Sequence, residues 1–272
     1  MTLVCPDRPG IVASISEGLL HLEANILENA QFSDLPTGMF CMRTRFESPI
    51  GDASEIAGAL RARADALHAK RAVRREDARC RALLMVSKYD HCLVDLLYRW
   101  HAGELPIDIP VVVSNHGDLE ATVSSYGIGF EHLPAAAAAE DRVRKLVAAH
   151  DVELVVLARY MQIISDDLCR ELAGRMINIH HSFLPSFKGA KPYHQAWERG
   201  VKVIGATAHY VTPELDEGPI IDQDVARVGH AHTPDQMVII GRDLERVVLS
   251  RAVKAHSEGR VFLLGRRTVV FL

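Results

Sequence analysis

The stretch Met176-Ile177-Asn178-Ile179-His180 predicts a β-strand, because its residues alternate in the manner of one. Residues two positions apart in a strand project to the same face, so the side chains of Asn178 and His180 are predicted to point together. A helix-breaking loop, residues 181–189, follows at once and places the pair at the carboxyl end of that strand. Ligands of open α/β sheets bind at this edge.

Asp216 follows in residues 211–219, and the three polar residues together suit acyl transfer. An amide donor holds a developing oxyanion, an imidazole carries or polarises a proton, and a carboxylate orients the imidazole or activates water. This chemistry needs no nucleophilic serine or cysteine. Taken alone, Asn178 and His180 are equally compatible with structural hydrogen bonding at a strand end.

After residue 81 the sequence alternates predicted strands and helices. Strands are predicted at residues 82–87, 109–114, 154–157 and 176–180, with helices at 92–102 and 140–150. This alternation favours an α/β fold with a Rossmann-like, mostly parallel sheet. Pro134 and the alanines of residues 135–139 are predicted to form a loop that enters the second helix.

The first 70 residues have a different order of predicted elements. Strands are predicted at residues 2–5, 25–32 and 39–46, helices at 11–22 and 54–67, and a weak last strand at 70–75. This order indicates a ferredoxin-like α+β domain. The expected organisation is therefore an N-terminal domain of residues 1–70, a linker of residues 71–81 and a catalytic domain of residues 82–272.

Residues 178–189 and 211–223 resemble the signature segments of the folate-dependent formyltransferase superfamily. The resemblance covers roughly residues 80–270 and implies a catalytic centre of Asn178, His180 and Asp216. Residues 86–93 and 180–196 are similar, more narrowly, to the formyltetrahydrofolate deformylases. Those enzymes hydrolyse 10-formyltetrahydrofolate to tetrahydrofolate and formate, which controls the one-carbon folate pool and supplies formate for purine synthesis. The resemblance implies folate as substrate and no tightly bound cofactor.

The same resemblance implies a folate pocket, because flat apolar walls with backbone donors and acceptors suit a pterin ring. The expected folate-binding residues are Leu157, Tyr160, Met161, Gln162, Ile163 and Ile164, with Val211 and Thr212 as the opposite wall. His209, on a predicted strand of residues 204–210, is a further catalytic candidate that would fix Asp216 or a bound water. His181 is a candidate for controlling water, and a solvent-facing loop position is the alternative.

The loop Ser87-Lys88-Tyr89-Asp90-His91 bears on the choice of acceptor. Sugar-phosphate binders of the superfamily use a glycine-rich turn here, so that backbone amides approach a phosphate. The bulk of this loop and the charge of Asp90 favour water over a phosphorylated amine. Two alternatives stay open, a formyltransferase acting on an amine of the glycinamide ribonucleotide type and a non-catalytic folate or amino-acid sensor.

Residues 7–12 resemble the opening of an ACT domain. ACT domains commonly bind small effectors, often amino acids, and the alternative is a structural or dimerising module. Pairing of such domains implies a homo-oligomer, because an edge strand or a helix face can be shared across a two-fold axis.

Composition limits the remaining classes of partner. The chain has 272 residues, 48% of them hydrophobic, and a net charge of −4, which gives no reason to expect nucleic acid or an anionic membrane as partner. Its five cysteines form no C-x-x-C pair, and without a secretory signal or a long apolar run the expected location is cytoplasmic. No metal is expected, because the candidates His180, His181, His194 and His209 lack the spacing of a closed site.

Overall fold

The computed structural model describes residues 1–134, 136–186 and 192–272 and divides into two compact units. One unit consists of residues Met1–Ala78 and Glu258–Leu272, and the other of residues Arg79–Ser257. The division falls inside the expected linker of residues 71–81. Ala135 of the predicted loop at 134–139 and residues 187–189 of the predicted loop at 181–189 lie outside the described residues.

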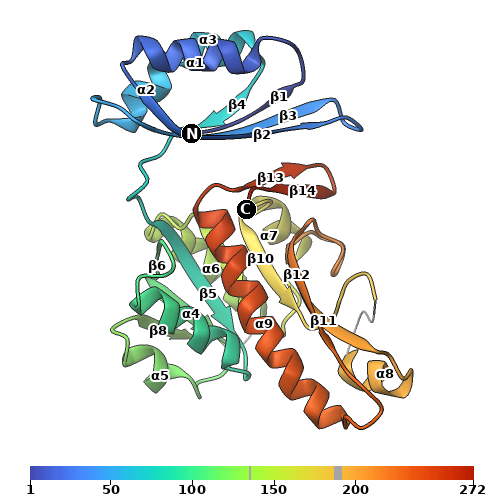
Figure 1. Ribbon diagram of the computed structural model, residues 1–272. Helices are drawn as coiled ribbons and strands as arrows, with labels where there is room; N and C mark the ends of the chain where they lie inside the picture. Colours follow the sequence, from blue (N-terminus) through green and yellow to red (C-terminus); the bar gives the residue numbers. More distant parts are fainter. Residues whose placement is uncertain (135, 187–191) are drawn as a thin grey trace. The chain divides into compact units, whose positions relative to one another are not determined.

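The N-terminal part of the first unit has a ferredoxin-like topology (Figure 1). Its antiparallel sheet has the strand order β2-β3-β1-β4. The elements are β1 (Thr2–Pro6), α1 (Ile11–His21), β2 (Asn25–Asp34), β3 (Met39–Glu47), α2 (Ala53–Ala59), α3 (Arg61–Ala66) and β4 (Lys70–Ala72). The single helix predicted over residues 54–67 is thus two helices, separated at Leu60, whose ψ of −2° departs from α-helical geometry and whose side chain is buried in the core.

The C-terminal hairpin belongs to this first unit, which differs from the expected catalytic domain of residues 82–272. The hairpin consists of β13 (Val261–Leu264) and β14 (Arg267–Val270). Phe262 and Leu264 pack with Cys41 in a cluster of their own, separate from the core that contains Phe40 and Met42. Successive residues of β3 point to opposite faces, so the hairpin covers an apolar sheet face that the helices leave open.

The second unit is an α/β domain whose sheet is mostly parallel, as predicted. The strand order is β12-β11-β10-β9-β5-β7-β8, in which β10, β9, β5, β7 and β8 run parallel. Strand β11 is antiparallel to both of its neighbours, β10 and β12. The strands are β5 (Cys80–Val86), β6 (Ile107–Asp108), β7 (Val111–Ser114), β8 (Gly129–His132), β9 (Leu154–Leu157), β10 (Met176–His180), β11 (Val203–Tyr210) and β12 (Ile220–Arg227). The helices are α4 (His91–His101), α5 (Glu120–Ser124), α6 (Ala136–Ala149), α7 (Asp166–Glu171), α8 (Pro192–Glu198) and α9 (Pro234–Ser257).

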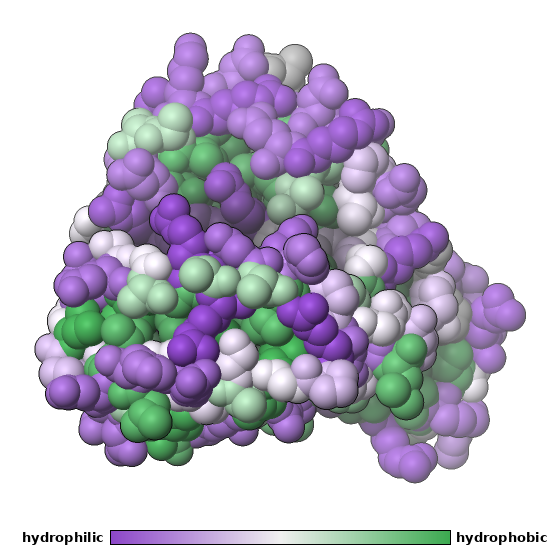
Figure 2. Space-filling model, turned by 90° about the horizontal axis from the view of Figure 1, so that it is seen from above, coloured by the Kyte–Doolittle hydropathy of each residue, from purple (hydrophilic) through white to green (hydrophobic). Residues whose placement is uncertain are grey.

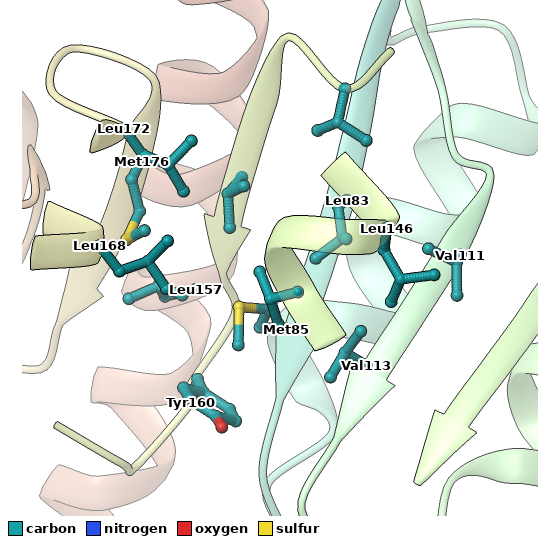
Figure 3. Packing of buried hydrophobic residues seen from close by; sticks show 13 residues of the cluster. Leu83, Met85, Val111, Val113, Leu146, Leu157, Tyr160, Leu168, Leu172 and Met176 are labelled. Carbon is teal, nitrogen blue, oxygen red and sulfur yellow. The ribbon is translucent and has the colours of Figure 1, made fainter. Parts of the chain in front are cut away.

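Helices cover both faces of this sheet (Figure 1). Helices α4 and α9 pack together on one face, while α6 and α7 contribute to a core on the other. Figure 3 shows that core, in which Leu146 of α6 lies near Leu83 of β5 and Leu168 of α7 lies near Leu157 of β9. Tyr160 lies at its border and is 7% exposed. The segment that follows β9 therefore begins in a packed core.

The surface mixes residue types. Hydrophilic residues cover most of the face in Figure 2, and hydrophobic residues interrupt them in small patches. None of the helices within residues 1–134, 136–186 and 192–272 combines the length and the apolar composition that a bilayer span requires.

Candidate active site

The candidate site lies where β10 ends beside β11. Asn178 and His180 both lie on β10, and the antiparallel register pairs Asn178 directly with His209 of β11. Directly opposed residues of an antiparallel pair project to the same face. The strand alternation expected from the sequence therefore places three polar side chains together, and the loop after β11 adds Asp216.

The distances among the predicted catalytic residues are short. His180 Nδ1 lies 3.2 Å from Asp216 Oδ2, and His209 Nε2 lies 3.7 Å from Asp216 Oδ1. Asn178 Nδ2 lies 3.3 Å from His209 Nε2. The side chains of His180 and Asp216 are only 5% and 10% exposed, so their interactions are little weakened by solvent.

A close backbone approach holds Asp216 in place. A Cβ atom at Gly218 would lie 1.7 Å from the carbonyl oxygen of Tyr210 and 3.2 Å from His209 Nδ1. The Tyr210 amide also donates to the Pro219 carbonyl over 2.9 Å. Asp216 itself adopts a left-handed φ of 57°, a conformation that costs free energy and is common at functional sites.

The hydrogen bonds define which nitrogens carry protons. His209 Nδ1 lies 2.9 Å from the Tyr210 carbonyl oxygen, which only accepts, so this nitrogen carries a hydrogen. In the neutral ring His209 Nε2 then accepts from the Asn178 amide, which leaves the second amide hydrogen of Asn178 for a ligand. His180 Nδ1 donates to Asp216, and His180 Nε2 is buried without a partner among the described residues.

Asp216 is ionised in this setting. Burial by itself raises the pKa of a carboxyl group, but the hydrogen bond from His180 and the nearby ring of His209 outweigh that effect. The pKa of Asp216 is consequently held well below its ordinary value of 3.8. A fixed negative charge beside His180 compensates the positive charge of a protonated ring.

A cavity of about 690 Å³ opens onto these residues. All of the sequence-predicted folate-binding residues line it, and we call them the folate wall: Leu157, Tyr160, Met161, Gln162, Ile163, Ile164, Val211 and Thr212. Leu157 and Tyr160 also belong to the core cluster, whereas Met161 and Ile163 are 56% and 79% exposed at the rim. One end of the wall is thus fixed by packing and the other is open to a ligand.

Comparisons with known proteins agree with this geometry. Residues 80–253 match the family model described as formyl transferase. A formyltetrahydrofolate deformylase of Corynebacterium sp. (strain P-1) is 50% identical over 99% of this chain and 96% of its own length. This chain belongs to the formyltetrahydrofolate deformylase family.

Solved structures extend the comparison. The formyltetrahydrofolate deformylase of Burkholderia mallei has a TM-score of 0.95 and 46% identity, covering 100% of this chain and 98% of its own. Glycinamide ribonucleotide transformylase 1 of Symbiobacterium toebii has a TM-score of 0.67 and 31% identity, covering 71% of this chain and 95% of its own. The catalytic unit is therefore shared by deformylases and transformylases.

Sequence reasoning missed a second polar cluster in the same cavity, which we call the Glu245 cluster: Glu245, His91, Arg159 and Tyr193. Glu245 is 1% exposed. The sequence contains one signal for it, because the buried positions of α9 include Gly241, Glu245, Val248, Leu249 and Ala252. A glutamate at an apolar position of such a pattern is expected to have buried partners.

Two residues of the Glu245 cluster, His91 and Glu245, form with Cys92 the one group of metal-ligating side chains in the described part of the chain. Burial, followed by the charge of Glu245, raises the pKa of the Cys92 thiol well above its ordinary value. A thiol that keeps its proton is a poor ligand, and Glu245 is already hydrogen-bonded to His91 and Tyr193. The donor set fits a hydrogen-bonded cluster better than a metal centre.

His181 lines the cavity and is partly buried. It therefore does not have the fully solvent-facing loop position that was the alternative. Burial, and next the charge of Arg159, lower the pKa of His181 to about 3. The unfolded chain binds this proton near pH 6.5, so the unfolded state holds more protons between pH 6.5 and 3 and the free energy of unfolding falls as the pH falls through that window.

We expect this titration to remove about 2 kcal/mol of stability by pH 5, and His181→Gln to abolish that loss. Urea unfolding of both proteins between pH 7 and pH 5 measures it. His230→Gln, at an exposed histidine, is the control. Parallel pH dependence in wild type and His181→Gln would show that the His181 ring is not held neutral.

Proposed function

We propose that this chain hydrolyses 10-formyltetrahydrofolate to tetrahydrofolate and formate. The observation that carries the proposal is the convergence of Asn178, His180 and Asp216 beside a cavity lined by the folate wall. Relatives named formyltetrahydrofolate deformylase at 41% to 50% identity over nearly the whole chain support the same reaction.

In the proposed mechanism, water attacks the formyl carbon, and the negative charge that develops on the formyl oxygen is bound by two donors. One donor is the Asn178 amide that His209 orients. The other is Nε2–H of a protonated His180, whose charge Asp216 compensates. Donors that are held in place before the reaction need no rearrangement, which is the main source of their catalytic effect.

Asp216 receives the proton of the attacking water, directly or through an ordered water. Its lowered pKa makes it a weak base towards free water, so the transfer becomes favourable only as the water oxygen bonds to carbon and turns acidic. The bond between the formyl carbon and N10 then breaks, N10 takes a proton, and formate leaves. Asn178→Ala is expected to lower kcat about 100- to 1000-fold, as the loss of one oxyanion donor does.

The direct test is incubation with 10-formyltetrahydrofolate without any amine. Equal amounts of formate and tetrahydrofolate are expected. Formyl transfer that occurs only with an added amine would support the transferase alternative, and folate binding without turnover would support the sensor alternative. Either result would contradict the proposal.

The rim of the folate wall offers a test of substrate binding alone. Ile163→Ala removes an exposed apolar side chain of the cavity, so we expect KM to rise about three- to tenfold, since burial of such a side chain contributes about 1 kcal/mol or more. The free energy of unfolding should stay within about 0.5 kcal/mol of wild type. Steady-state kinetics and urea unfolding check both.

Ile239→Ala is the control, because Ile239 is an exposed isoleucine of α9 outside the cavity lining. An equal KM for both variants would remove Ile163 from the folate wall.

We also propose that the N-terminal unit is a regulatory or dimerising ACT-like module that binds a small effector such as an amino acid. Its ferredoxin-like strand order supports this role. The edge strand β2 supports a homo-oligomer, because Ile26, Leu27 and Phe32 are 37%, 48% and 44% exposed along it. Sedimentation measurements and amino-acid titrations test the two parts separately.

A further inference from the structure

In the Glu245 cluster, both oxygens of a buried carboxylate on the wall of the cavity have partners. Tyr193 Oη donates to Glu245 Oε1 over 2.8 Å, and His91 Nε2 lies 2.8 Å from Oε2. Arg159 Nε lies 3.3 Å from the same Oε2. Both oxygens of Glu245 are therefore engaged by protein groups, although the side chain lines the cavity.

Gly241 provides the space that Tyr193 needs to reach Glu245. A Cβ atom at Gly241, one turn before Glu245 on α9, would lie 2.1 Å from Tyr193 Cζ and 2.2 Å from its hydroxyl oxygen. A glycine in a helix interior costs stability relative to alanine. Here it makes the space in which the phenol of α8 lies against α9.

The cluster is continuous with the catalytic centre. The ring of His181 lies 5.1 Å from that of His180 and 6.1 Å from that of Tyr193. On the other side, the guanidinium groups of Arg159 and Arg242 each lie 5.5 Å from the ring centre of Tyr89. Large aromatic and cationic side chains thus line the cavity beyond His180.

These features bear on the choice of nucleophile. Water is small and gives up one proton as its oxygen bonds to the formyl carbon and the carbon–N10 bond breaks. An amine brings a substituent, and as its nitrogen bonds to the same carbon it becomes cationic and needs acceptors for its N–H groups before one proton is lost. A carboxylate whose two oxygens are both engaged, beside a wall of large side chains, offers such an amine little room and no open acceptor on this side of the cavity.

We propose that Tyr193 and Glu245 are specificity-determining residues that reserve this side of the cavity for water and keep amines from the formyl carbon. The inference rests on the proposed deformylase function. It assigns Tyr193 a role through Glu245, since the phenol occupies the oxygen that would otherwise accept an N–H of an attacking amine.

The test measures how the formyl group divides between two acceptors. Wild type and Tyr193→Phe are incubated with 10-formyltetrahydrofolate and hydroxylamine, and formate and N-formylhydroxylamine are both quantified, along with tetrahydrofolate. We expect Tyr193→Phe to raise the ratio of N-formylhydroxylamine to formate at least tenfold. A loss of folded enzyme lowers both products equally and leaves this ratio unchanged.

Two further variants complete the design. Gly241→Ala displaces the Tyr193 ring without altering Glu245 and is expected to raise the ratio in the same direction. Gly58→Ala, at a helical glycine whose Cβ would meet nothing within 4 Å, and Tyr98→Phe, at a tyrosine 61% exposed, are the controls. An unchanged ratio in Tyr193→Phe overturns the inference, whereas absence of formate with wild type overturns the deformylase proposal itself.

Discussion

Asp216→Asn is expected to lower kcat for formate release about 10,000-fold. An asparagine keeps the size of the side chain but loses the charge that compensates a protonated His180. Its amide group can also turn a donor towards His180 Nδ1, which reverses the hydrogen bond that fixes the ring. Losses of about this size follow when the carboxylate partner of a catalytic histidine becomes an amide.

The same substitution should leave the fold intact, because asparagine tolerates the left-handed backbone at this position. The lowered pKa of Asp216 means that the ionised side chain stabilises the protein above about pH 4 and that this contribution is lost as the pH falls through the folded-state pKa. We therefore expect a loss of about 1–3 kcal/mol at pH 7, measured by urea unfolding.

Asp151→Asn is a matched control. Asp151 also has a left-handed φ, 48°, but its side chain is 83% exposed and pairs with Arg81 at the surface. Such pairs contribute little to stability, so activity and stability should both match wild type. Near-normal kcat in Asp216→Asn would remove Asp216 from the proposed chemistry.

Gly218→Ala is expected to lower kcat about 100-fold or more through geometry alone. The added methyl group would overlap the Tyr210 carbonyl oxygen at 1.7 Å, so the loop that carries Asp216 must move away from β11. A displacement of about 1 Å in a catalytic group can cost about 100-fold in rate.

The substitution should also cost about 1–3 kcal/mol of stability, because backbone overlap cannot be relieved by a side-chain rotation. Kinetics and urea unfolding measure the two effects. Gly117→Ala is the control, since the nearest atom to its Cβ is 3.9 Å away. A Gly218→Ala enzyme with wild-type kcat and stability would show that the close approach does not position Asp216.

The sequence predicted those parts of the site that depend on local periodicity. Alternation in β10 is a local property, so Asn178 and His180 could be expected on one face before any tertiary contact was known. The folate wall follows a buried strand in the same way, and its predicted residues all line the cavity. Their individual roles in binding and catalysis stay predictions.

Features that depend on contacts between distant segments could not be predicted. The pairing of Asn178 with His209 depends on the register of β11, which tertiary packing sets. Glu245 has its partners on α4, on the segment after β9 and on α8, all far away in the chain, so only its buried position in α9 gave a signal. The C-terminal hairpin likewise covers strand residues more than two hundred positions earlier, as the Arg267–Asp34 ion pair illustrates.

A single-turnover reaction in water enriched in oxygen-18 tests most directly whether water attacks the formyl group. The enzyme in excess over 10-formyltetrahydrofolate, without any amine, is expected to give one equivalent of tetrahydrofolate and formate that carries one labelled oxygen atom. Mass spectrometry of the formate reads the label. Unlabelled formate, or formyl release that requires an amine, would contradict the assignment of this chain as a hydrolase.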